Sequence, residues 1–379
     1  MDFEAFVRDI TENNWNVFGT EVYENGELKY SYGDTKEIHE IYSATKTVLS
    51  VAFGIAYDEG LIDLDRPAAD YIPEAKAAKV AEKAEGSEAF SKITVRRLLT
   101  MSVIGFPFRA EGDNYLKFAL SCDIKPEETG FIYSNISAYL AGVCLTNAIG
   151  YDLGRFIEER IFKPLNIIKY EYVRSPEGYF YGASQMKMSV NDLSKIGLLL
   201  MNRGVYNGIR ILSEEYVDMA TSVQMMNREG GYGFFVWMYR DGFSINGKLK
   251  QKCYVLPKRG IVVTYLAHIE DDSKDLLYSM EENILGISCE DRAVERITQM
   301  EKIFDHALMK LRDIREGSLD PEKISPEISV LEAYYTGKAW KEDLKLDEEG
   351  RLPSDLKRGV LSEDGIYDLL EEYDAVRRR

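Results

Sequence analysis

The chain has 379 residues, of which 45% are hydrophobic and 29% are charged, and its formal net charge is −17. Such an acidic balance argues against partners such as nucleic acid or an anionic membrane surface. No apolar run is long enough for a membrane span, and the acidic N-terminus does not resemble a signal peptide, so we expect a cytoplasmic protein with no membrane contact.

The cysteines and histidines are scattered, and none of them has the spacing of metal ligands. We therefore predict reduced thiols, no metal site and no cofactor. The sequence also lacks a P-loop, a G-x-G-x-x-G motif and the G-x-S-x-G elbow of many Ser-His-Asp hydrolases. The cysteines are Cys122, Cys144, Cys253 and Cys289.

Strand patterns stand at both ends of the first 288 residues, and helix patterns stand between them. Two β-rich runs flank Asn25-Gly26, a strong hairpin signal because a type I′ turn needs positive φ at both central residues. Residues 44–59 then read as a helix, and residues from about 61 to 222 read as helices and loops. Strand patterns return in "YGFFVWMYR", "QKCYVLP" and "IVVTYLA".

This order predicts an α+β fold with an antiparallel sheet built from both the N-terminal and C-terminal segments and flanked by helices. An all-helical lobe would be inserted at about residues 61–222. Charged side chains make up 39 of the 91 residues from 289 onward, against 72 of the 288 before them. We therefore predict two domains, 1–288 and 289–379, the second small and mainly α-helical with an amphipathic first helix.

Ser43 and Lys46 form an S-x-x-K pair, and residues three apart share one face of a helix. A serine hydroxyl becomes a good nucleophile when a nearby base takes its proton. A lysine can be that base when an apolar environment lowers its pKa, and the run "TVLSVAFGIAY" supplies such an environment. Taken alone, the pair is more typical of a serine helix cap followed by a chance lysine.

A second pattern, Tyr133-Ser134-Asn135, is a Y-x-N triplet followed by a run with helical character. A tyrosine hydroxyl near a lysine can pass a proton to a leaving group, and an asparagine amide can hold a substrate carbonyl. By itself the triplet is better explained by a buried aromatic residue and a helix cap.

Together the two motifs resemble those of the serine β-lactamase and penicillin-binding protein superfamily, in its class C β-lactamase and esterase branch. The resemblance covers about residues 15–285, and a set of further segments keeps the order of the family. These segments are "ITVRRLLTM", "IFKPLNI", "SVNDLSKIGLLLMNRGVYNGIRILSEEYV" and "YGFFVWM".

The resemblance implies a role for each motif residue. Ser43 would be the acylated nucleophile, Lys46 its general base or proton relay, and Tyr133 the second proton-transfer group. Asn135 would bind the amide or ester side of the substrate.

The third motif of the family, K-T-G or H-x-G, is expected on the edge strand before "QKCYVLP". Its best match is Lys248-Leu249-Lys250. Lys248 would bind a substrate carboxylate and lower the pKa of Tyr133, and the backbone N–H groups of Ser43 and Gln251 would form the oxyanion hole. Lys250 in place of glycine would add bulk beside the substrate, which argues against efficient β-lactam hydrolysis.

We therefore expect a serine hydrolase that acts through an acyl-enzyme on a small ester, an amide or a D-amino-acid peptide. The alternative is a catalytically weak or inactive hydrolase scaffold that serves as a binding or regulatory protein. The tail, about residues 293–375, resembles a small bacterial helical domain of unknown function. We expect it to be a packing or dimerising appendage, through which any homodimer would form, with a lid or adaptor as the alternative.

Overall fold

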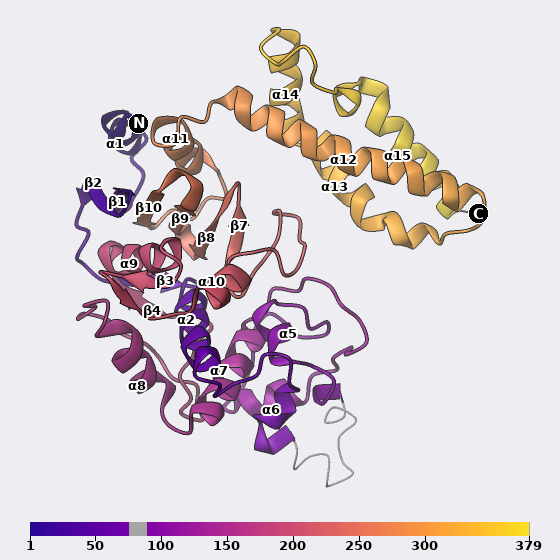
Figure 1. Cartoon of the computed structure of the whole chain (residues 1–379). Coiled ribbons are helices and arrows are strands. Elements are labelled where there is room, and N and C mark those ends of the chain that lie inside the picture. Colours follow the sequence, from indigo (N-terminus) through magenta and orange to yellow (C-terminus); the bar gives the residue numbers. More distant parts are fainter. Residues whose placement is uncertain (76–88, 379) are drawn as a thin grey trace. The chain divides into compact units, whose positions relative to one another are not determined.

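The protein is described from a computed structural model, which defines residues 1–75 and 89–378. The chain divides into two compact units (Figure 1). The larger unit consists of Asn13–Asp272, and the smaller unit joins Met1–Glu12 to Ser273–Arg379. Each unit has a buried hydrophobic core of its own.

A six-stranded antiparallel sheet lies in the larger unit, with the strand order β2-β1-β10-β9-β8-β7 (Figure 1). Two N-terminal strands therefore share the sheet with four later ones through the pairing of β1 with β10, which confirms the predicted sheet built from both ends. Asn25 and Gly26 form the β1–β2 turn with φ of 51° and 83°, as the hairpin signal predicts. The strands are β1 (Val17–Glu24), β2 (Glu27–Gly33), β7 (Trp237–Tyr239), β8 (Gly242–Gly247), β9 (Gln251–Leu256) and β10 (Ile261–Ala267).

The segment between β2 and β7 is mainly helical, which confirms the predicted insertion. Its short strands are β3 (His39–Tyr42), β4 (Met186–Met188), β5 (Val205–Tyr206) and β6 (Ile209–Arg210). Its described α-helices are α2 (Thr45–Asp58), α5 (Val95–Leu99), α6 (Tyr115–Leu120), α7 (Asn135–Ile149), α8 (Leu153–Ile157), α9 (Val190–Met201) and α10 (Glu214–Ala220). Helix α9 packs on β1, β9 and β10, and the absence of a side chain at Gly197 permits this, because a Cβ there would lie 2.5 Å from Cys253 Sγ.

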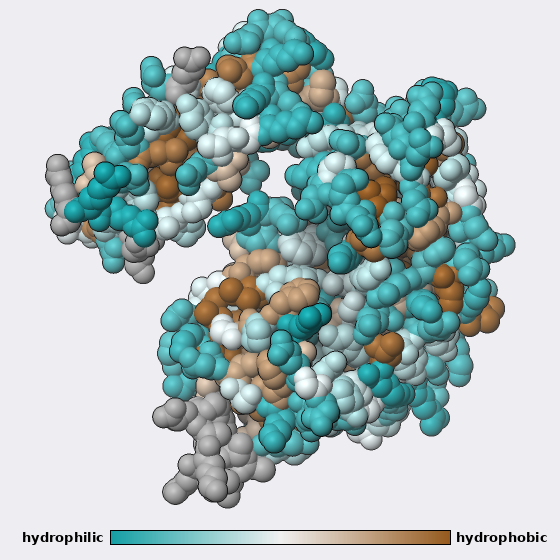
Figure 2. Space-filling view, turned by 180° about the vertical axis from the view of Figure 1, so that it is seen from behind, coloured by the Kyte–Doolittle hydropathy of each residue, from teal (hydrophilic) through white to brown (hydrophobic). Residues whose placement is uncertain are grey.

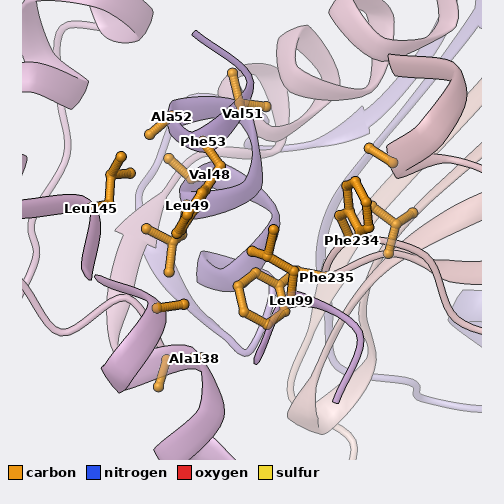
Figure 3. Packing of buried hydrophobic residues seen from close by; sticks show 14 of the residues in the cluster. Val48, Leu49, Val51, Ala52, Phe53, Leu99, Ala138, Leu145, Phe234 and Phe235 are labelled. Atoms are coloured by element: carbon orange, nitrogen blue, oxygen red, sulfur yellow. The ribbon is translucent and has the colours of Figure 1, made fainter. Parts of the chain in front are cut away.

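Helix α2 is enclosed on several sides, and every residue from Thr45 to Ala56 is buried. It packs against α7, α8 and α10. In Figure 3, Ala138 and Leu145 of α7 lie on one side of α2, and Leu99 and Phe235 lie on the other. A polar side chain on this helix therefore loses nearly all contact with water unless protein groups replace it.

The smaller unit is helical, as predicted for the C-terminal region. Its helices are α1 (Phe3–Glu12), α11 (Asp275–Asn283), α12 (Cys289–Arg315), α13 (Ser325–Tyr335), α14 (Lys338–Glu348) and α15 (Glu363–Arg377). Helix α12 begins with a capping box between Ser288 and Asp291, which fixes its start beside the predicted boundary. Helices α1 and α11 contact each other and belong to this unit, so the two units divide at 272/273. The predicted domain boundary at 288/289 stays a prediction.

Hydrophilic residues cover most of the face shown in Figure 2, with separate hydrophobic areas between them. This agrees with the large number of acidic side chains in the sequence. None of the helices that the structure describes combines the length and the apolar character needed to cross a bilayer.

We predict that residues 1–288, expressed without the tail, stay soluble and fold cooperatively. The core of the larger unit draws on residues between Tyr23 and Leu266, whereas the second core draws on residues between Ala293 and Tyr373. Gel filtration and thermal unfolding followed by circular dichroism test this, with residues 289–379 as the complementary fragment. Aggregation of the first fragment, or a melt without cooperativity, would show that the tail is an integral part of the hydrolase fold.

Candidate active site

Ser43 lies in the turn that connects β3 to α2, and several hydrogen bonds fix this turn. Tyr42 has a φ of 48°, and the Thr45 hydroxyl donates to its carbonyl oxygen at 2.6 Å. The same hydroxyl accepts a hydrogen bond from the N–H of Met186 at 3.2 Å, which ties the turn to β4. Ala44 is the N-cap of α2, so Ser43 is the residue before the cap, and its carbonyl oxygen accepts from the N–H of Lys46 at 3.0 Å.

Lys46 points from the first turn of α2 toward three oxygen atoms. Its Nζ lies 3.1 Å from Ser43 Oγ, 2.7 Å from Asn135 Oδ1 and 2.6 Å from the carbonyl oxygen of Ala183. The residue is only 1% exposed, and burial lowers the pKa of its amine to about 7. A substantial fraction of the amine is therefore neutral at physiological pH.

The three oxygen atoms around Nζ can satisfy either form of the amine, and it is burial that favours the neutral form, whose hydrogen bonds can be assigned as follows. A neutral amine has two N–H donors and one lone pair, whereas an ammonium has three donors and no lone pair. The oxygens of Asn135 and Ala183 can only accept, so they take both N–H groups. The lone pair of Lys46 is then left for the Ser43 hydroxyl, which can donate its proton.

Helix α7 supplies the second pair of predicted site residues. The Ser134 hydroxyl caps the helix by accepting from the N–H of Ile136 at 3.0 Å, and it donates to the carbonyl oxygen of Pro107 at 2.7 Å. This capping places Asn135 beside Lys46 and Tyr133 just before the helix. The ring centroid of Tyr133 lies 4.8 Å from Lys46 Nζ.

Burial raises the pKa of Tyr133 to about 12, while its side-chain hydrogen bond with Ser43 acts in the opposite direction and the charge of Glu229 adds to the increase. Tyr133 is therefore protonated near pH 7. The predicted lowering of this pKa by Lys248 is wrong, because Lys248 is exposed and is not among the groups that act on the Tyr133 hydroxyl.

The structure corrects the placement of the third motif. Residues Lys248–Lys250 form a 3₁₀ turn between β8 and β9, not part of an edge strand, and the edge strand of the sheet on this side is β7. Leu249 and Lys250 have φ of 60° and 70° because Gly247 pairs with Gln251 and only three residues connect them. The close backbone approach is at Gly247, where a Cβ would lie 2.2 Å from the carbonyl oxygen of Ile41. The bulk of Lys250 is therefore not on the strand that passes the Ser43 turn.

Gln251 is buried at the start of β9, and its side chain serves the sheet. Its amide nitrogen donates to the carbonyl oxygen of Ala267 at 2.5 Å and to that of Leu249 at 3.3 Å. Its amide oxygen accepts from the N–H of Ala267 at 3.2 Å. These bonds hold the β8–β9 turn against β10. The proposed role of the backbone N–H of Gln251 as a donor in an oxyanion hole stays a prediction.

Three contributors to the site have no motif in the sequence. The first is the carbonyl oxygen of Ala183, which any residue could supply. The second is Tyr181. Burial raises the pKa of this residue, and its hydroxyl forms a hydrogen bond with the Asn135 side chain. The third is an aromatic cluster around Tyr133, in which the Trp237 ring lies 5.4 Å and the Tyr232 ring 6.2 Å away, centroid to centroid. The aromatic residues of "YGFFVW" were a signal for this cluster, although the spacing did not say what they would contact.

Among the described residues, no three His, Cys, Asp or Glu side chains are grouped so that they could hold a metal ion. The assembled groups are a serine hydroxyl, a buried amine, a protonated phenol and an amide. These groups can carry out nucleophilic attack and proton transfer.

Comparison with known families gives two matches along the chain. A model described as Beta-lactamase matches residues 19–279, and one described as Domain of unknown function (DUF4298) matches residues 297–378. Both resemblances seen in the sequence are thereby confirmed.

Three individual proteins that this chain resembles each share less than 30% sequence identity with it. A class C β-lactamase from Rhodobacter sphaeroides has a TM-score of 0.57 at 16% identity, over 75% of this chain and 99% of that one. A D-stereospecific amidohydrolase from Streptomyces sp. has a TM-score of 0.57 at 18% identity, over 76% and 100%. At these identities the likeness shows the fold. The acyltransferase calJ of Penicillium decumbens is 29% identical over 167 residues, which span 36% of this chain and 39% of that protein.

The pKa of Lys46 predicts the pH dependence of activity. If the neutral amine is the base, the rate of ester hydrolysis rises with pH and levels off above about 7, because protonation removes the lone pair. The Asn135→Asp variant would place a carboxylate beside Nζ, which should raise the pKa of Lys46 by about one to three. The acid limb should then move to higher pH. Profiles of kcat/KM between about pH 5 and pH 9 measure this.

Asn147→Asp is the matched control, because Asn147 lies near the other end of α7, donates to the carbonyl oxygen of Tyr71, and gains the same charge. Its acid limb should stay in place. A limb that does not move in Asn135→Asp, or moves equally in both variants, would contradict the assignment of Lys46 as the base.

Proposed function

Because the chain belongs to the β-lactamase family and is a serine hydrolase, we propose that it acts through an acyl-enzyme on Ser43 with a small ester or amide. The observation that carries the proposal is the environment of Lys46. Its amine is buried, has two carbonyl-type acceptors for its N–H groups, and lies 3.1 Å from the Ser43 hydroxyl.

In the acylation step, Ser43 Oγ attacks the substrate carbonyl carbon as its proton passes to the amine of Lys46. Negative charge develops on the carbonyl oxygen, and the backbone N–H of Ser43, at the start of α2, is a donor for it. Collapse of the tetrahedral intermediate breaks the bond to the leaving group, which takes a proton from Tyr133. The raised pKa of Tyr133 favours this role as an acid over a role as the resting base.

In the deacylation step, water gives a proton to Tyr133, which lost its own to the leaving group, as it attacks the acyl carbon. Ser43 Oγ then leaves with the proton that Lys46 took during acylation. Asn135 donates through its amide N–H₂ to the substrate, because its Oδ1 is held by Lys46. The substrates that fit are small esters, amides or D-amino-acid peptides, with Lys248 at the β8–β9 turn as the proposed partner of a carboxylate. We place this activity in the cytoplasm, and we propose that any homodimer forms through the C-terminal helices.

A panel of p-nitrophenyl esters, D-alanyl peptides and nitrocefin tests the proposal. Wild type should release product from at least one of them, and Ser43→Ala from none. Tyr133→Phe should be slower by about 10² to 10⁴ because one proton transfer is lost. Tyr232→Phe removes another buried hydroxyl from the same aromatic cluster and should keep wild-type rates.

Turnover that persists in Ser43→Ala would overturn the residue assignment. Equal losses in Tyr133→Phe and Tyr232→Phe would indicate damage to the aromatic cluster instead of a lost proton transfer. Inactivity of wild type on the whole panel, with no acyl-enzyme detected by mass, would favour the binding or regulatory alternative.

A further inference from the structure

A short loop before α6 is fastened to the start of α7, beside the proposed nucleophile. The carbonyl oxygen of Pro107 accepts from the Ser134 hydroxyl at 2.7 Å, and the carbonyl oxygen of Phe108 accepts from the N–H of Asn135 at 2.7 Å. Arg109 directly follows Phe108 in this loop. The hydrogen bond between Phe108 and Asn135 therefore fixes the backbone next to Arg109.

Phe108 presents an apolar surface at this position. Its side chain is 56% exposed, and its ring is stacked near that of Tyr133 with a centroid distance of 6.4 Å and an interplanar angle of 26°. Covering apolar surface of this kind with apolar groups of a ligand is favourable. Here the ring lies next to Tyr133, and the backbone carbonyl of the same residue binds the N–H of Asn135, the proposed substrate-binding residue.

Arg109 is exposed, and it forms no hydrogen bond or ion pair with any residue that the structure describes, including Glu111 and Asp113, which follow it. Its positive charge acts on the hydroxyl of Tyr181, which in turn hydrogen-bonds the Asn135 side chain. The guanidinium therefore lies within electrostatic reach of Tyr181.

Most other arginines that the structure describes in this unit have a partner, and Arg228 is an exception. The chain carries 17 more acidic than basic side chains, so carboxylates are abundant. Six other arginines of the unit lie within ion-pair distance of a carboxylate: Arg66, Arg96, Arg155, Arg160, Arg174 and Arg203.

We propose that Arg109 binds a carboxylate on the acyl part of the substrate, so that the enzyme prefers esters and amides whose acyl chain ends in an acidic group. Guanidinium and carboxylate groups pair through two parallel hydrogen bonds, and the methylene groups of such an acyl chain would cover Phe108. This inference rests on the proposed function, since it assigns a substrate class to the Ser43 site. It is separate from Lys248, which follows Gly247 in the β8–β9 turn.

Two esters of equal chain length test the preference: mono-p-nitrophenyl glutarate, which ends in a carboxylate, and p-nitrophenyl valerate, which ends in a methyl group. After subtraction of the uncatalysed rates, the ratio of their kcat/KM values measures selectivity for the acidic acyl chain. The ratio in Arg109→Gln should fall by about tenfold or more, because a hydrogen-bonded charge is lost. Arg109→Glu should lower it further, and Arg109→Lys should keep part of it.

Arg155→Gln is the matched control, because it removes the same charge from an exposed arginine on α8 that pairs with Glu159. Its ratio should equal that of wild type. An unchanged ratio in Arg109→Gln, or an equal fall in Arg155→Gln, would overturn the role of Arg109 while leaving hydrolysis by Ser43 intact.

A binding measurement separates this inference from the chemistry. Glutaric acid monoamide is titrated calorimetrically into Ser43→Ala and into the same variant carrying Arg109→Gln. A rise in Kd of about tenfold or more in the double variant supports the inference even if no ester is hydrolysed. Equal Kd values, or no binding to Ser43→Ala at concentrations up to the millimolar range, would contradict it.

Discussion

The buried amine of Lys46 is the feature on which the proposed chemistry of this protein depends. An ammonium in a dry interior is unfavourable, whereas a neutral amine needs only two acceptors and one donor. The oxygens of Asn135 and Ala183 and the hydroxyl of Ser43 meet that need. The same burial that makes α2 a core helix therefore converts an ordinary lysine into a group with a pKa of about 7.

The fold assembles this environment from distant parts of the chain. The sheet brings β8 beside the turn before α2, where Gly247 allows its backbone to approach Ile41. The inserted helices bring the capped start of α7 and the segment around Ala183 to the same amine. Because the sheet needs both ends of the unit, this arrangement forms only when the whole unit has folded.

Much of this was accessible from the sequence, for physical reasons. Side-chain period and turn residues indicated the sheet and the inserted helices, and residues three apart on a helix placed Lys46 beside Ser43. The turn at Lys248–Lys250 was misplaced because a three-residue connection between paired strands has no side-chain period to reveal it. The Ala183 carbonyl could not be found, since every residue has one, and the lack of a partner at Arg109 is a property of the folded loop alone.

The central claim is that Lys46 activates Ser43, and a serine-directed fluorophosphonate probe tests it most directly. Intact-mass analysis followed by peptide mapping should find one adduct per chain, on Ser43. Labelling of Lys46→Met should be slower by about 10² or more, because no base remains to take the proton. An unlabelled wild type under conditions that label a known member of the family, an adduct elsewhere, or equal labelling of both proteins would contradict the claim.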